Sequence, residues 1–442
     1  MQTGSHQEGI WVITPEHPAS NLLKGMKEIK MKPENSIPES VIEQLSKTAP
    51  GLEIWWDSSP LVYENWAKQV LTDAPEEKRA ILEVQLRRLY DPDNTTQSLF
   101  RGVTTNPPLS LNAIKDDPER WKAWIQIYQK ENPAACVNEV FWELYKEIVR
   151  TGAQIFLPIF NASGYRFGHI SGQVDPRAAF DADRMLAQAL ELSSLAPNVM
   201  VKVPGTAEGM RVIRQLTAHG VSTNATLCYV VAQFVAVAEA VQAGLLEARR
   251  NGVDLTCWRS VVTQMSARWE DAVEFREQAE AAGFELTTEY KRWGSLSIFK
   301  RAHQIFRQRA YPSKMLICSL RLGPVVNGQQ RVWHLEHTAG ADAVFTLPPV
   351  YIAQLLLQAD NIEFKPRIWE PVPEAFLVAL NKVPYFVHGM DEHGYIHAEF
   401  NTLPPLCTTY NEFSVATEKM VSFVREHMQE PIVTNNTTPH FF

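Results

Sequence analysis

The sequence predicts a closed (β/α)8 barrel, the α/β fold in which eight parallel strands alternate with helices around a single core. Two observations support this prediction. Short apolar segments of strand length alternate with longer segments in which apolar residues recur at helical spacing, and this alternation is typical of a parallel sheet. Eight such strand segments occur and no convincing ninth, which favours a closed barrel over an open sheet.

The predicted elements follow one another along the middle of the chain. The eight strands are expected at residues 52–56, 99–103, 168–174, 198–203, 220–224, 258–263, 314–319 and 341–346. Amphipathic helices are expected between them, among others at residues 138–150, 205–218, 229–249 and 350–359.

The two ends of the chain differ from the middle. Residues 1–37 lack clear periodicity and are interpreted as an N-terminal extension. The barrel is expected over 38–375, followed by a C-terminal helical segment packed on it at 376–428. Residues 429–442 are expected to form a loose tail.

Composition narrows the class of protein. Of 442 residues, 45% are apolar and 21% charged, which is typical of soluble globular proteins. The net charge of -8 argues against a nucleic-acid or membrane-surface binder, since both need clustered positive charge. Five scattered cysteines, no visible secretory signal and no long apolar run predict a cytoplasmic protein. The histidines show no metal-binding spacing, so we expect no metal and no cofactor.

Polar residues at the carboxyl ends of the strands are the candidates for chemistry, because barrel enzymes place their sites there. Seven of the eight predicted strands carry such residues. Each one alone is better explained as a loop or capping residue, but together they predict a site at one mouth of the barrel. They are Asp57, Thr104, Thr105, Asn106, Gln173, Asp175, Lys202, Asn224, Thr226, Thr263, Ser319 and Arg321.

Lys202 is the most informative of these residues. In N-V-M-V-K-V-P-G, strand alternation puts three valines on one face and Met200 and Lys202 on the other. The valine face suits packing under helices, so Lys202 is predicted to point into the barrel. Burial would lower its pKa and favour the neutral amine, which can attack a carbonyl and form a Schiff base. The alternative is a lysine at a strand end that extends to solvent.

Five motifs, in order, carry a resemblance to a known family: V-T-T-N-P-P-L (103–109), Q-V-D-P-R (173–177), K-V-P-G-T-A-E-G (202–209), N-A-T-L (224–227) and S-L-R (319–321). They resemble transaldolase, over roughly residues 50–350. The resemblance implies the class I aldolase type of barrel and transfer of a dihydroxyacetone unit between phosphorylated sugars through a lysine Schiff base. It also implies the pentose phosphate pathway and carbohydrate metabolism, and a homodimer is possible.

The resemblance also implies roles for individual residues. Lys202 matches the Schiff-base lysine, Asp57 the aspartate that assists bond cleavage, and Thr226 a residue that orients a catalytic water. The residues that match substrate-binding positions are Thr104 and Asn106 for the donor hydroxyls, Asn224 beside the lysine, Thr263 where the family usually has Ser, and Arg268, Ser319 and Arg321 for phosphate.

Gln173 departs from the family, which has Glu at this catalytic position. An amide cannot accept and return a proton at neutral pH, although it can still position the water. Related fructose-6-phosphate aldolases also have Gln there, but they add a Tyr on the sixth strand, and that position is Met265 here. His169, Tyr165 and Tyr229 are the nearby candidates for a substitute.

Two alternatives to transaldolase therefore stay open. One is an aldolase that acts on a free dihydroxyacetone-type donor, or on an unusual sugar in a specialised pathway. The other is a non-catalytic relative that binds sugar phosphates or a protein partner. Lys202, Asp57 and Asn106 argue against the second alternative, since binding alone does not need a buried lysine. Trp55 and Trp56, next to Asp57, are candidates for lining the site.

Overall fold

The computed structural model describes residues 37–358 and 362–428. Within them, the residues from Glu39 onward form one compact unit. The predicted tail and all but the last residue of the predicted N-terminal extension lie outside the described residues.

Eight parallel strands close into a barrel, so the predicted fold class is confirmed. Around the barrel they follow the order β1-β10-β7-β6-β5-β4-β3-β2, which closes because the first strand pairs with both the second and the last in chain order. Their bounds are Glu53–Trp56 (β1), Phe100–Val103 (β2), His169–Gln173 (β3), Val199–Pro204 (β4), Thr223–Cys228 (β5), Ser260–Met265 (β6), Lys314–Cys318 (β7) and Val344–Leu347 (β10).

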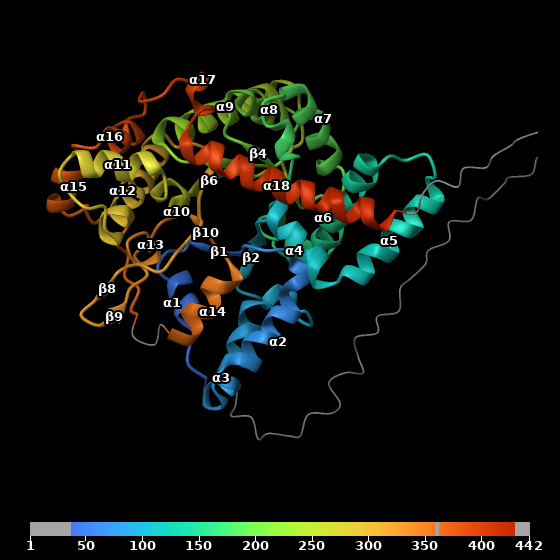
Figure 1. Cartoon of the computed structure of the whole chain (residues 1–442), viewed down its shortest axis with the longest axis horizontal. Helices are drawn as coiled ribbons and strands as arrows, with labels where there is room; N and C mark the ends of the chain where they lie inside the picture. Colours follow the sequence, from blue (N-terminus) through green and yellow to red (C-terminus); the bar gives the residue numbers. More distant parts are fainter. Residues whose placement is uncertain (1–36, 359–361, 429–442) are drawn as a thin grey trace, which may run out of the picture. The chain divides into compact units, whose positions relative to one another are not determined.

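Helices surround the barrel strands, as Figure 1 shows. Helices α1 to α9 are Val41–Ser46, Tyr63–Asp73, Glu76–Leu89, Pro107–Asp116, Pro118–Glu131, Val137–Ala162, Ala182–Ser193, Ala207–Ala218 and Val231–Arg250. Helices α10 to α18 are Ser266–Glu270, Val273–Ala281, Thr288–Gln308, Trp333–Glu336, Pro349–Gln358, Glu374–Leu380, Pro384–Met390, His397–Phe400 and Pro404–His427. The last of these, α18, crosses the molecule in front of the strands in the view of Figure 1.

All eight predicted strands are present, although several boundaries differ by two or three residues and two predicted elements end much too early. The fifth strand runs to Cys228 rather than ending at 224, so Asn224 and Thr226 lie inside β5. The inward-facing residues of this strand are polar, so the apolar pattern does not mark where the strand ends. Helix α6 continues to Ala162 rather than ending at 150, because Ala153, Phe156 and Phe160 extend its buried stripe.

Two short elements escaped the sequence analysis. The strands β8 (Val325–Val326) and β9 (Gln329–Gln330) form an antiparallel hairpin after β7. Asn327 and Gly328 join them, with φ of 51° and 76°. An Asn-Gly pair with positive φ at both positions is the preferred two-residue hairpin turn.

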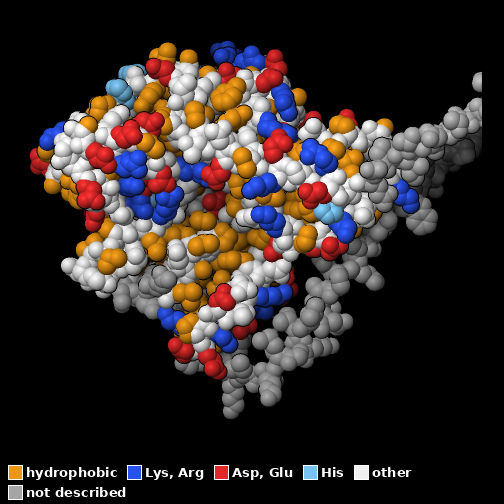
Figure 2. Space-filling view, viewed as in Figure 1, with side chains coloured by type: hydrophobic (Ala, Val, Ile, Leu, Met, Phe, Trp, Pro, Cys, Tyr) orange, Lys and Arg blue, Asp and Glu red, His pale blue; other side chains and the backbone are white. Residues whose placement is uncertain are grey.

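One helix is long and apolar enough to cross a membrane by length and composition, but its surroundings explain its composition. This is α9, in which 67% of the most apolar window is buried inside the protein. It is therefore a core helix that packs on the barrel, and among the described residues no other helix passes the same test. On the face seen in Figure 2, acidic and basic side chains are interspersed, with hydrophobic side chains gathered below α18.

The two tryptophans of β1 point to opposite faces of the strand. Trp55 is fully buried, and its Nε1 donates to Glu53 Oε2 at 3.0 Å, toward the amino end of β1. Trp56 packs against the rings of Tyr63 and Phe100, with centroids 5.1 and 5.6 Å away. Both rings are therefore packing residues, and neither adds to the polar mouth that begins at Asp57.

Gly102 in β2 lets the Trp55 indole cross the barrel. A Cβ at position 102 would lie 2.5 Å from Trp55 Cε2, far inside van der Waals contact. We therefore expect Gly102→Ala to reduce the free energy of unfolding by about 1–3 kcal/mol, as overpacking does in rigid cores. Urea denaturation followed by fluorescence measures this change.

The double variant Trp55→Leu/Gly102→Ala provides the control. A smaller side chain at 55 leaves room for the new methyl, so the second substitution should cost much less in that background than in the parent. Equal losses in both backgrounds would contradict the proposed clash.

Candidate active site

Lys202 lies inside the barrel near the carboxyl end of β4. It pairs in register with Gln173 of β3 and with Asn224 of β5. The residue is only 3% exposed, and its Nζ donates to the carbonyl oxygen of Thr105 at 3.0 Å. The side chain therefore faces the interior, as strand alternation predicted, and does not extend to solvent.

Asp57 is the charged neighbour of Lys202. Burial lowers the pKa of Lys202, while the negative charge of Asp57 acts in the opposite direction. Burial also raises the pKa of Asp57, against the attraction of Lys202. Both shifts bring the pair closer to a neutral amine beside a carboxyl group that can exchange protons, which suits attack of the amine on a carbonyl.

Thr104 holds Asp57 in place. Its hydroxyl donates to Asp57 Oδ1 at 2.6 Å and shares a further hydrogen bond with the hydroxyl of Thr346 on β10. Since β1 lies between β2 and β10 in the barrel, these two strands clamp the carboxylate from both sides. Sequence analysis found Thr104 but missed Thr346, which no motif marks.

A chain of hydrogen bonds fixes the amide of Asn224. Its Nδ2 donates to Ser171 Oγ at 2.9 Å, and its Oδ1 accepts from the hydroxyl of Thr263 at 2.7 Å. These contacts join β3, β5 and β6 across the interior, beside Lys202. Asn224 and Thr263 thus lie together near the lysine.

Asn106 caps helix α4 in this structure. Its Oδ1 accepts the backbone N–H of Leu109 at 3.0 Å, so the residue begins the helix that follows β2. The capping contact uses only the amide oxygen. The Nδ2 donor of Asn106 makes no hydrogen bond in the described part of the chain, which leaves it for a substrate hydroxyl.

Gln173 lies at the end of β3 with an incompletely satisfied side chain. Its backbone N–H donates to the hydroxyl of Tyr145 in α6 at 2.8 Å. Its Oε1 is buried and has no hydrogen-bond partner in the described residues. Buried polar atoms are nearly always paired, so this oxygen marks a place where a water or substrate hydroxyl fits.

Tyr229 is the one substitute candidate that lies on the side of Thr226. Its hydroxyl donates to Thr409 Oγ1 at 2.7 Å and lies 3.5 Å from Met265 Sδ. Thr226 Oγ1 in turn lies 3.9 Å from the same sulfur. Burial raises the pKa of Tyr229, so its hydroxyl stays protonated and can act only as a donor or as a relay.

His169 and Tyr165 are in the wrong part of the barrel. His169 begins β3, so it lies at the amino end while Gln173 lies at the carboxyl end. Four residues of strand correspond to about 13 Å. Tyr165 precedes His169 and lines a hollow of 780 Å³ at that same amino end, together with Glu53, Arg259 and Lys314. Although His169 and Tyr165 are close to Gln173 in sequence, they therefore lie too far from it in the barrel to replace its acid–base function.

Arg268, in α10, lies beside the lysine and is already paired. Its positive charge lowers the pKa of both Lys202 and Asp57. Its two terminal nitrogens lie 2.5 and 2.9 Å from the two carboxylate oxygens of Glu412 in α18. The residue is separated from Glu412 by 144 positions in the chain, so sequence analysis missed this partner.

Arg321, which follows β7, has a carboxylate partner as well. Its Nη2 lies 2.6 Å from Asp271 Oδ2. Ser319, two residues earlier, has φ of 57°, and its carbonyl accepts the N–H of Ala267 at 3.3 Å. That bond ties the turn after β7 to the helix that carries Arg268, so the three predicted phosphate residues belong to one connected rim.

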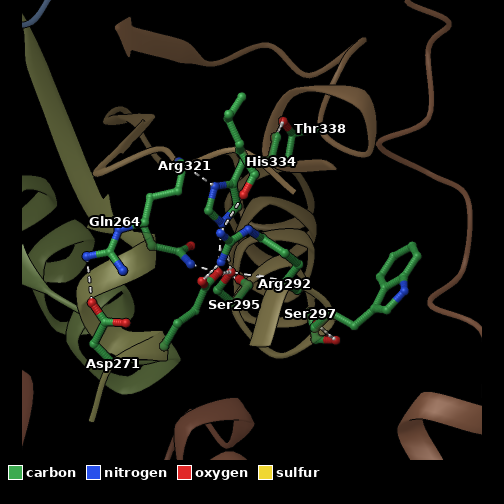
Figure 3. Close-up of polar contacts among 11 residues, drawn as sticks. Gln264, Asp271, Arg292, Ser295, Ser297, Arg321, His334 and Thr338 are labelled. Carbon is green, nitrogen blue, oxygen red and sulfur yellow. Dashed lines mark hydrogen bonds and ion pairs between the residues drawn. The ribbon is translucent and has the colours of Figure 1, made fainter. Parts of the chain in front are cut away.

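A buried polar network supports this rim from behind (Figure 3). Glu270, next to Asp271, binds Arg292 and accepts from Ser295 at 2.6 Å and from His334 Nε2 at 2.7 Å. Burial lowers the pKa of His334 well below its usual value, so the ring is neutral and its Nδ1 is free to accept. It accepts the backbone N–H of Arg321 at 3.3 Å.

The network therefore positions the backbone at Arg321 rather than its guanidinium. Arg292 adds a second tie, because its Nη2 donates to the carbonyl of Leu322 at 2.7 Å. The members come from α10, α12 and α13, which no single sequence pattern connects.

Cys318 at the end of β7 is a further residue of the site that no sequence motif marks. It lies beside Asp57 and Lys202, and burial raises its pKa to about 12, so it is a neutral thiol.

Comparison with known proteins gives one family. A family model described as "Transaldolase/Fructose-6-phosphate aldolase" matches residues 85–383. A transaldolase of Saccharopolyspora erythraea is 35% identical over 187 residues, which is 42% of this chain and 50% of that protein. A transaldolase of Kocuria rhizophila is 31% identical over 50% of this chain and 58% of its own length. One from Thiobacillus denitrificans is 28% identical over 62% of this chain and 78% of its own.

Lys202→Met should abolish borohydride trapping of a ketose phosphate, because it removes the buried amine inside the barrel and replaces it with an apolar side chain of similar length. Mass spectrometry of the reduced protein measures the adduct. Lys300→Met is the matched control. Burial lowers the pKa of Lys300 to about 8, but its Nζ is bound to backbone carbonyls of residues 367, 368 and 370, so this variant should trap normally. An undiminished adduct in Lys202→Met would refute the assignment.

Asp57→Asn should shift the pH dependence of Schiff-base formation to lower pH. The carboxylate raises the pKa of Lys202, so its removal lowers that pKa further, and the neutral amine then appears earlier as pH rises. Initial rates of borohydride trapping measured from acid to alkaline pH give the midpoint for the variant and the parent. A midpoint that stays in place or moves to higher pH would mean that Asp57 carries no charge beside the free lysine.

Proposed function

Because the chain belongs to the transaldolase/fructose-6-phosphate aldolase family, we propose that it transfers a dihydroxyacetone unit between phosphorylated sugars through a Schiff base on Lys202. The observation that carries the proposal is the buried lysine itself, held between Gln173 and Asn224 and beside Asp57. A buried amine of lowered pKa next to a carboxyl group has no evident structural purpose, whereas it is what attack on a ketone requires.

The proposed reaction begins with attack of the Lys202 amine on the ketose carbonyl. Loss of water from the resulting carbinolamine gives an iminium ion. Asp57 then takes the proton of the hydroxyl on the far carbon of the bond that breaks, so that this carbon leaves as the aldehyde, and the bonding electrons pass to the iminium, which becomes an enamine. The aldehyde product leaves, the acceptor aldehyde adds in the reverse sense, and hydrolysis frees the lysine.

The other predicted residues have supporting roles in this proposal. Thr226 and Gln173 orient the water that is lost and regained, and the unpaired Gln173 Oε1 is the group that supports this role. Thr104, Asn106, Asn224 and Thr263 bind the donor hydroxyls. Ser319, Arg321 and Arg268 bind phosphate, since guanidinium groups match a phosphate dianion. No cofactor takes part. The cytoplasmic location, the pathway and a homodimer stay predictions.

The second candidate is an aldolase that releases or uses free dihydroxyacetone. Two observations favour it specifically. Gln173 cannot transfer the protons that the family's Glu transfers, and both arginines of the phosphate rim already bind carboxylates. The chain also spans only 50% and 58% of the length of two of the similar transaldolases. Transaldolase activity of this chain is therefore itself part of the proposal.

A product assay separates the candidates. With fructose 6-phosphate as donor, transaldolase activity releases glyceraldehyde 3-phosphate only when erythrose 4-phosphate is present as acceptor. An aldolase releases it without an acceptor, together with dihydroxyacetone. Absence of both products and of a borohydride-stable adduct would leave a non-catalytic relative.

Gln173→Glu should raise transaldolase turnover by at least about tenfold, because positioned acid–base groups are worth roughly 10²–10⁴ in rate. The new carboxylate would replace an unpaired buried amide oxygen, so the backbone contact with Tyr145 is kept. Turnover with fructose 6-phosphate and erythrose 4-phosphate measures the effect. A flat or lower kcat in a folded variant would mean that another group, with Tyr229 as the remaining candidate, already moves these protons.

A further inference from the structure

Helix α18 is tied across the carboxyl end of the barrel by three side-chain contacts. Thr409 accepts from Tyr229, which follows β5, at 2.7 Å. Glu412 binds Arg268 after β6, and Glu418 binds Arg177 after β3, with the latter nitrogen and oxygen 2.8 Å apart. The helix is thus a strap over the mouth, and charged side chains of both signs meet along it in Figure 2.

The contact between Glu412 and Arg268 has the form of an anion bound in a phosphate site. Two guanidinium nitrogens face two carboxylate oxygens, at 2.5 and 2.9 Å. This paired arrangement is the one that arginine also makes with phosphate. Arg268 lowers the pKa of Glu412, so the carboxylate is ionised while it is bound.

The contact between Glu412 and Arg268 is accessible to solvent. The Glu412 side chain is 50% exposed and that of Arg268 is 24% exposed. A pair in contact with water is weak compared with a buried one, since water replaces much of the attraction. The Arg321 contact differs in kind, because its partner Asp271 directly follows α10, whereas Glu412 comes from α18, far away in the chain.

We propose that Glu412 is an internal competitor for substrate phosphate and sets the selectivity of this site between phosphorylated and free sugars. The inference rests on the proposed function for the identity of Arg268 as a phosphate ligand. A phosphorylated substrate must displace the carboxylate and overcome its repulsion before it reaches Arg268. An unphosphorylated ketose or dihydroxyacetone needs only Lys202 and the hydroxyl-binding residues, so Glu412 does not oppose it.

The experiment compares Glu412→Gln with the parent on two donors. KM for fructose 6-phosphate should fall about two- to fivefold, in the range for removal of a partly exposed charge partner. KM for unphosphorylated fructose and kcat for both donors should stay the same. Glu418→Gln is the matched control, because it removes a carboxylate from the same helix that binds Arg177 instead, and it should leave all four values unchanged.

A titration with inorganic phosphate tests the same idea without catalysis. Isothermal calorimetry should show that Glu412→Gln binds phosphate tighter than the parent by a similar factor. In an Arg268→Gln background the Glu412→Gln substitution should give no gain, because the site of competition is gone. This titration remains informative if no Schiff base is trapped, so failure of the proposed function and failure of this inference can be told apart.

Three results would overturn the inference. One is an unchanged or weaker phosphate affinity in Glu412→Gln, which would mean that the carboxylate orients Arg268 instead of competing for it. The second is an equal gain in Glu418→Gln, which would point to loosening of the whole helix. The third is no phosphate binding by parent and variant alike at millimolar concentration, which would mean that Arg268 belongs to no anion site.

Discussion

The desolvation of Lys202 is the constraint on which the rest of the site depends. An ammonium group inside a barrel loses most of its hydration, and the one direct hydrogen bond that Lys202 makes within the described residues, to the Thr105 carbonyl, replaces only part of that loss. The positive charge of Arg268 adds to the penalty, and the negative charge of Asp57 reduces it. The net effect is a lowered pKa of Lys202, which favours the neutral amine. The neutral amine is the form that can attack a carbonyl.

The neighbouring strands are arranged around this penalty. Side-chain hydrogen bonds from β3 through β5 to β6 hold Asn224, and Thr104 with Thr346 holds Asp57 from β2 and β10. Each of these strands is paired on both sides, so their backbones hold these side chains at fixed positions around the lysine. The closed barrel therefore keeps the groups that shift the pKa of Lys202 at fixed distances from it. The unpaired oxygen of Gln173 is the exception, and it lies at the position where the family pattern is broken.

Charge at the mouth is balanced within the protein. Arg268 and Arg321, the proposed phosphate ligands, each face a carboxylate, from α18 in one case and from the residue after α10 in the other. Behind them, the buried group of Glu270, Arg292 and His334 keeps the backbone of the rim in place. The backbone of the rim is thus held in place, and both of its arginine side chains are paired with carboxylates of the protein.

The sequence by itself determined the barrel and the direction of the lysine. Apolar periodicity located the eight strands because each must bury its outer face under helices, and alternation along N-V-M-V-K-V placed Lys202 inside. Both are properties of a few consecutive residues. The true end of β5 was not visible in the same way, because its inward residues are polar and only the barrel interior explains them.

Tertiary structure alone decided which polar groups meet. His169 is close to Gln173 in sequence but lies at the opposite end of the same strand, because a strand separates its residues instead of folding them back. Glu412 is 144 residues from Arg268 and yet binds it, because α18 returns across the mouth. Local patterns encode burial and direction, whereas a charge partner is set by where the helices pack, which depends on the whole chain.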